Sequence, residues 1–132
     1  MNDVEHLRLL SIFHYVVGGL MGLFSLFPLI HLALGLAMVS GALNTPGQQG
    51  PPPAFGWIFV VIPAVFILLG MTTAICIAVA GYKLATHTGH LFCLVMAGIE
   101  CMFMPFGTVL GVFTIIVLVR PSVKQLFGQT VD

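Results

Sequence analysis

The chain has 132 residues, of which 59% are hydrophobic and 6% are charged, and its formal net charge is zero. Soluble domains carry about 25% charged residues, so this composition excludes an ordinary water-soluble domain. The zero net charge and the absence of a basic run argue against a nucleic-acid partner. We therefore predict an all-α, polytopic membrane protein, folded as a single transmembrane domain over residues 1–132.

The first half of the chain predicts two long helices. No Asp, Glu, Lys or Arg lies between residues 11 and 82, a stretch far longer than the roughly 18 apolar residues that indicate one membrane helix. We predict the first helix over about 7–43, bent at Pro28, because proline removes a backbone hydrogen bond. A loop with three consecutive prolines follows, and the second helix runs over about 54–82 with a second kink at Pro63.

The last hydrophobic block predicts a hairpin of two short helices. They cover about 89–103 and 107–120, and a Pro-Phe-Gly turn separates them. Helices one and two are about twice as long, so we expect their outer ends to project past this turn and to need a protein cover. Leu36 and Phe59 are the candidate interface residues on those ends.

The basic residues predict the orientation. With four membrane spans, all of them fall on one side, which is the cytoplasmic side by the positive-inside rule. Both termini are therefore expected to be cytoplasmic. The residues concerned are Arg8, Lys83, Arg120 and Lys124.

Three intramembrane polar residues are the candidate sites: Glu100, His31 and His14. A carboxylate inside a membrane segment is costly and indicates a functional site. Glu100 is either a proton or cation site, or a neutral acid that holds helices together through hydrogen bonds. We place it near the outer interface, where His31 is a possible partner. His14 is expected toward the cytoplasmic face, and an interfacial histidine bonded to backbone or water is the simpler interpretation of both histidines.

Metal, haem and catalytic sites are not favoured. A paired-histidine haem through His14 and His90 is conceivable, and methionine and cysteine sulfurs suit Cu(I), but methionines in so apolar a chain usually fill space. The three cysteines form no CxxC motif, which favours free thiols. No nucleophile, base and acid are suitably arranged, so we predict no enzyme, no metal and no cofactor.

Small residues recur at four-residue spacing, a pattern that lets membrane helices approach closely. This spacing predicts tight helix packing, within the chain or between chains. The residues concerned are Gly18 and Gly22, then Gly70, Ala74 and Ala78, then Gly107 and Gly111.

The C-terminal segment PFGTVLGVFTIIVLVRPSVKQLF resembles small bacterial four-helix integral membrane proteins with a Pro-x-Gly-Thr-x-Leu-Gly turn. The matching residues are Pro105, Gly107, Thr108, Leu110 and Gly111. The resemblance implies a four-helix bundle in the bacterial inner membrane, and it implies no activity or site residue.

These observations favour a structural or accessory subunit that contacts membrane lipid and assembles as a homo-oligomer or within a larger membrane complex. The alternative is an oligomeric channel or carrier with Glu100 in its pathway. An enzyme or haem carrier comes third.

Overall fold

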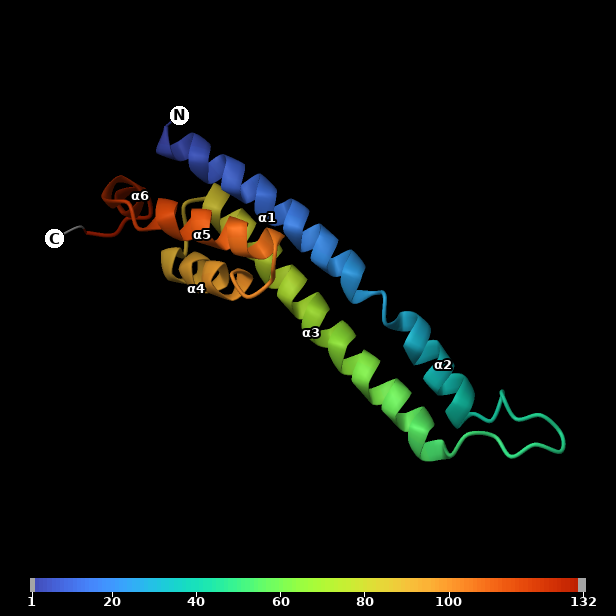
Figure 1. The fold of residues 1–132 in the computed structure, drawn as a ribbon. Helices are drawn as coiled ribbons and strands as arrows, with labels where there is room; N and C mark the ends of the chain where they lie inside the picture. The colour runs from blue at the N-terminus through green and yellow to red at the C-terminus, as the bar shows by residue number, and fades with distance from the viewer. Residues whose placement is uncertain (1, 131–132) are drawn as a thin grey trace. The chain divides into compact units, whose positions relative to one another are not determined.

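A computed structural model describes residues 2–130, and this part of the chain consists of helices, turns and loops, without a strand. The helices of the described residues are, in chain order (Figure 1), α1 (Asp3–Ser25), α2 (Leu29–Val39), α3 (Pro53–Ala85), α4 (His90–Glu100), α5 (Phe106–Leu118) and α6 (Pro121–Leu126). The prediction of an all-helical protein is confirmed.

The predicted bend at Pro28 is a short break between α1 and α2. Proline has no N–H and cannot continue the α-helical ladder. The chain turns here through tighter bonds, in which the N–H groups of Leu26, Phe27 and Leu29 each donate to the carbonyl three residues earlier. The helical segment also ends at Val39, before the predicted residue 43, and Gly41 follows with a left-handed φ of 75°.

The second predicted helix forms as α3, which begins and ends close to the expected residues. It runs without interruption through Pro63 for 33 residues. The two hairpin helices are shorter than predicted, at 11 residues for α4 and 13 for α5. Helix α4 is shorter because residues 101–105 form a turn, and α5 ends at Leu118 because Arg120 is extended before Pro121.

Two helical segments in the described part of the chain are long and apolar enough to cross a membrane. They are Asp3–Val39, which joins α1 and α2, and Pro53–Ala85. The α4 and α5 helices are apolar, but at 1.5 Å per residue they measure only about 16 Å and 20 Å. A hydrocarbon core is about 30 Å thick, so these two helices do not meet the same length criterion.

The chain separates into two compact units. Unit 1 contains residues 2–20 and 73–130 of the described chain, and therefore most of α1, the end of α3, and all of α4, α5 and α6. Its α4 and α5 helices form a side-by-side hairpin (Figure 1). Its core consists of apolar side chains, of which the most deeply buried are Leu7, Leu84, Cys93, Leu118 and Val123.

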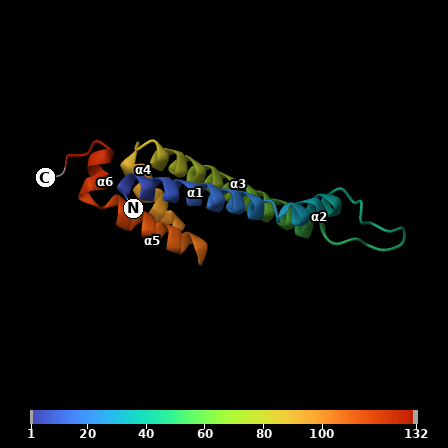
Figure 2. The ribbon, with the colours of Figure 1, turned by 90° about the horizontal axis from the view of Figure 1, so that it is seen from above.

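Unit 2 contains residues 21–72, with α2 lying alongside the first half of α3 (Figures 1 and 2). Gly35 makes this approach possible, because a Cβ at that position would lie only 2.6 Å from the backbone carbonyl carbon of Phe59. The His31 ring stacks on the Phe59 ring with centroids 6.5 Å apart. Most of the large apolar side chains of unit 2 are nevertheless exposed, including Leu36, Trp57 and Phe66.

Candidate functional site

One face of α1 carries the polar side chains that enter the core of unit 1. The buried positions are spaced three and four residues apart, which places them on a single stripe of a helix. Ser11 and His14 lie on this stripe among apolar neighbours, and both are buried. The stripe consists of Leu7, Leu10, Ser11, His14 and Gly18.

Small residues on α3 let this stripe approach closely. The Ser11 hydroxyl donates to the carbonyl of Gly81 at 2.7 Å. A Cβ at Gly81 would lie 3.0 Å from both the His14 Cβ and the Ser11 carbonyl oxygen. One turn further along α1, a Cβ at Gly18 would lie 3.1 Å from the carbonyl oxygen of Ala74. The glycines therefore set the depth at which His14 enters the core.

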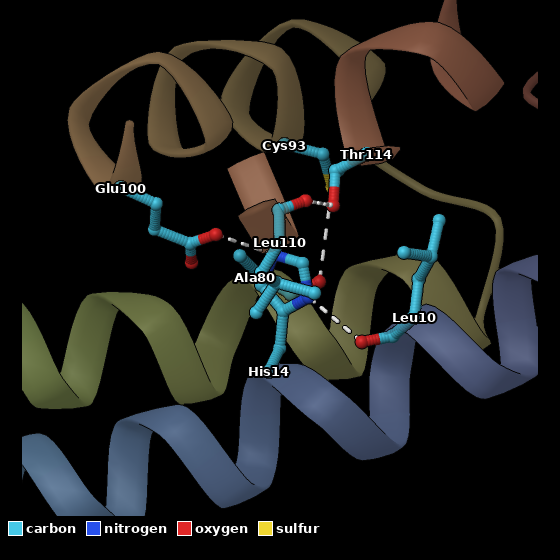
Figure 3. Close-up of polar contacts among 7 residues, drawn as sticks. All are labelled: Leu10, His14, Ala80, Cys93, Glu100, Leu110 and Thr114. Carbon is cyan, nitrogen blue, oxygen red and sulfur yellow. Dashed lines mark hydrogen bonds and ion pairs between the residues drawn. The ribbon is translucent and has the colours of Figure 1, made fainter. Parts of the chain in front are cut away.

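His14 meets Glu100, the last residue of α4, inside unit 1. The His14 Nε2 atom lies 3.2 Å from the Glu100 Oε2 atom, and both residues have no exposed surface. On the other side of the ring, Nδ1 lies 2.7 Å from the carbonyl oxygen of Leu10. Because that carbonyl can only accept, Nδ1 carries a proton and Nε2 faces the carboxyl group. Figure 3 shows the two side chains pointing toward one another from α1 and α4.

The surroundings of the pair offer it little additional polar contact. The Nε2–Oε2 contact is within ion-pair distance but lacks hydrogen-bond geometry, and Glu100 Oε1 meets no donor in the described part of the chain. The nearby Thr114 hydroxyl donates to the Leu110 carbonyl at 2.7 Å, and the Cys93 thiol lies 3.8 Å from the Ala80 carbonyl (Figure 3). Glu100 therefore depends on His14 for its polar contact.

His14 and Glu100 lie at the same height in unit 1 because α1, α4 and α5 are joined at one end. His90, at the start of α4, has Nε2 2.7 Å from the carbonyl oxygen of Leu118 at the end of α5. Arg120 follows and lies 3.3 Å from Asp3 at the start of α1. From this common end, His14 is eleven residues along α1 and Glu100 is ten residues along α4, or about 15–17 Å in each case. The expectation that Glu100 and His14 lie near opposite faces of the membrane is therefore wrong.

The other predicted residues have separate surroundings. His31 belongs to unit 2 and contacts the rings of Phe27 and Phe59, while Leu36 is exposed. Of the small residues, Gly22 supplies the carbonyl that accepts from the Ser25 hydroxyl, and a Cβ at Gly70 would lie 2.7 Å from the Ser25 Cβ.

In unit 1, Ala74 is buried and Ala78 is half-buried, each against Gly18, whereas Gly107 and Gly111 lie where α5 meets α4. A Cβ at Gly107 would lie 2.5 Å from the carbonyl oxygen of Glu100, and a Cβ at Gly111 would collide with the carbonyl oxygen of Ala97. The hairpin therefore closes through backbone contact at these two glycines.

The pair joins two helices through a single polar contact in apolar surroundings. Such a contact can hold α1 against α4, and it can carry a proton between a carboxyl group and an imidazole. No group of three or more His, Cys, Asp or Glu side chains in residues 2–130 is arranged to hold a metal ion, and the three cysteines are free.

Sequence reasoning named both His14 and Glu100 but did not pair them, and it assigned no structural role to Thr114. The available signal was Ser11 and His14 one turn apart in a segment without charge. Comparison of this chain with family models, curated proteins and solved structures finds no match.

Proposed function

We propose that the chain is a small integral membrane subunit that packs with copies of itself or within a larger membrane complex. The observation that carries this proposal is the length of α3, whose 33 residues form one uninterrupted helix. Its only charged side chain is Lys83, near its C-terminal end.

Lipid cannot cover this helix along its whole length. Thirty-three residues span about 50 Å, whereas the hydrocarbon core is about 30 Å thick. Even a tilt of 40°, the upper end of the usual range, accommodates only about 39 Å. About two turns of apolar helix are therefore left to be covered by protein. The exposed apolar side chains of Leu36 and Ile58 in unit 2 are suited to contact with another protein chain.

The burial of Glu100 supports a structural role over an ion pathway. A carboxylate that lines an aqueous path needs a water-accessible face, whereas this side chain is enclosed by its own chain and faces His14. We therefore place the subunit hypothesis ahead of a channel or carrier that uses Glu100. A neutral or ionic contact between two helices is a common use of polar side chains in membranes.

Single-cysteine variants test the assembly. In a background with the three native cysteines replaced by alanine, Leu36→Cys is expected to form disulfide-linked dimers, or crosslinks to a larger partner, in native membranes. Leu91→Cys, which is also exposed but belongs to the shorter α4, is the matched control and is expected to remain unlinked. The Phe59 side chain stacks on His31 of the same chain and is a less suitable reporter.

Two results together would remove the support for this proposal. The first is the absence of any crosslink at Leu36, and the second is a monomeric mass after extraction in mild detergent. A single protein species of oligomeric mass favours a homo-oligomer, whereas co-purifying chains favour a larger complex.

The proposed topology has four spans in a bacterial inner membrane, with both termini in the cytoplasm. It rests on the positive-inside rule, because the four basic residues then share one side. A reporter fused at the C-terminus should give a cytoplasmic signal, and the same reporter inserted at residues 47–50 should give a periplasmic one. Identical signals at both positions would contradict this topology.

A further inference from the structure

An apolar groove of about 600 Å³ runs between α1 and α5 in unit 1. The side chains at its floor are buried, whereas those along its walls are exposed. Its floor includes Leu10, Leu110 and Val117, and its walls include Phe13, Val109 and Phe113. The two helices therefore present their exposed apolar side chains along one continuous groove.

The length and cross-section of the groove indicate what kind of molecule fits in it. The lining side chains extend from residue 6 to 17 on α1 and from 106 to 117 on α5, or eleven residue steps on each helix. At 1.5 Å per residue the groove is about 17 Å long, so its mean cross-section is about 35 Å². A helix with side chains is about 10–12 Å across and needs roughly 80 Å² or more. The groove is too narrow to enclose a helix, which would protrude from its open side, whereas a single hydrocarbon chain fits within it.

The two ends of the groove differ in polarity. At one end, His6 lines the groove. The contact of 3.3 Å between Arg120 and Asp3 brings the start of α1 to the end of α5, so the guanidinium belongs to the same end. Pro105 and Phe106 line the opposite end and carry no charge.

This polarity matches an amphiphile. A guanidinium has five N–H donors, and one contact with Asp3 leaves others free for phosphate oxygens. On the proposed topology this end lies at the cytoplasmic interface, where anionic lipids are found.

We propose that the α1–α5 groove binds one acyl chain of an anionic phospholipid, with its phosphate at the His6 and Arg120 end. This inference rests on the membrane insertion proposed above. It adds a defined lipid site to the general lipid contact of an integral membrane protein.

A photoreactive lipid tests the proposal. The full chain is reconstituted in phosphatidylcholine vesicles that contain a trace of phosphatidylglycerol with a diazirine on its acyl chain. After irradiation, peptide mass spectrometry should place the label on Phe13, Val109 and Phe113. Val112 and Ile116, which are exposed on α5 but do not line the groove, should carry much less label.

Matched tryptophan variants separate the groove from the rest of α5. Val109→Trp fills the groove and should reduce its labelling about tenfold, the effect expected when two methylenes are excluded from an apolar site. Ile116→Trp, the same change at an exposed position outside the groove, should leave the labelling unchanged. If Val109→Trp does not fold, Phe13→Trp on the facing wall replaces it.

The head-group assignment has its own test. Arg120→Gln should lower the preference of the groove for the phosphatidylglycerol probe over a phosphatidylcholine probe with the same acyl diazirine. Equal labelling of the wild type by the two probes would overturn the assignment of an anionic head group.

Other results would overturn the site itself. Even labelling of the whole exposed face of α5, or unchanged labelling in Val109→Trp, would show that no defined site exists. Disulfide-linked dimers of Val109→Cys with no lipid label in the groove would show that a second copy occupies it. Release of the wild-type chain from membranes by alkaline carbonate would instead contradict membrane insertion, so the two proposals fail in distinguishable ways.

Discussion

Replacement of His14 by leucine is expected to lower the free energy of unfolding by about 3–5 kcal/mol, the range observed when one member of a buried ion pair is removed. The His14 Nε2 atom is 3.2 Å from Glu100 Oε2, and both residues are fully buried. Without the imidazole, the carboxyl group remains in the core with no polar partner and with the full cost of its desolvation. Reversible unfolding in mixed micelles, followed by far-ultraviolet circular dichroism, measures this loss.

A double variant identifies the pair as the cause. His14→Leu combined with Glu100→Met replaces both polar groups with apolar ones and should recover most of the lost stability, because buried pairs are often replaceable by apolar residues. Recovery of most of this loss requires a coupling energy near the upper end of the range for residues in contact, at about 3 kcal/mol.

The matched control for this cycle is His6→Leu, the same substitution on the same helix. In the described residues the His6 ring has one hydrogen bond, with the carbonyl of Asn2, and it borders the groove without being buried. In micelles without anionic lipid, the change should therefore stay within about 0.5 kcal/mol. Additive single effects at His14 and Glu100, with no recovery in the double variant, would contradict the pairing.

Substitution of Gly111 by alanine is expected to destabilise the protein by about 1–3 kcal/mol, the usual cost of overpacking. A Cβ at this position would collide with the carbonyl oxygen of Ala97, and it would lie 2.6 Å from Cys101 Sγ and 3.0 Å from Cys101 N. Two of these three contacts are with backbone atoms of the α4 segment, which cannot move aside as a side-chain end can. The α4–α5 hairpin would have to open, and Glu100 lies on that part of α4.

Gly98→Ala is the matched control, because Gly98 is also helical but a Cβ there would meet nothing within 4 Å. Alanine favours a helix over glycine by up to about 1 kcal/mol, so this variant should be neutral or more stable. Thermal unfolding in detergent should therefore give shifts of opposite sign for the two variants. Equal shifts would mean that Gly111 does not set the distance between α4 and α5.

The local features of the chain were predictable because they depend on neighbouring residues. The absence of charge between residues 11 and 82 predicted long apolar helices, and Pro28 predicted the interruption near residue 28. The predicted ends were less accurate: the first helical segment ends at Val39 and not at residue 43, and α4 ends at Glu100 and not at 103. Ends are set by individual turns, such as the left-handed Gly41, that composition does not reveal.

The partner of Glu100 was not predictable in the same way. The sequence predicts that Glu100, in the last hydrophobic block, is important. The energetic cost of a carboxylate in an apolar segment depends only on the residue and its surroundings. Its partner depends on the relative depth and rotation of α1 and α4. His14 and Glu100 are 86 residues apart in the chain (100 − 14). Successive residues of a helix point about 100° apart. The spacing of residues in the sequence therefore cannot decide which histidine Glu100 contacts.

The sequence by itself determined the class of this protein and its local breaks: apolar helices, a proline interruption, a glycine-rich hairpin and one costly carboxylate. Each of these follows from the solvation or backbone geometry of residues close together in the chain. The tertiary structure alone decided that Glu100 meets His14 and that α1 and α5 enclose an apolar groove. The physical reason is that both features need helices far apart in sequence to reach a particular depth and rotation, and backbone contacts at Gly81 and Gly111 set that depth.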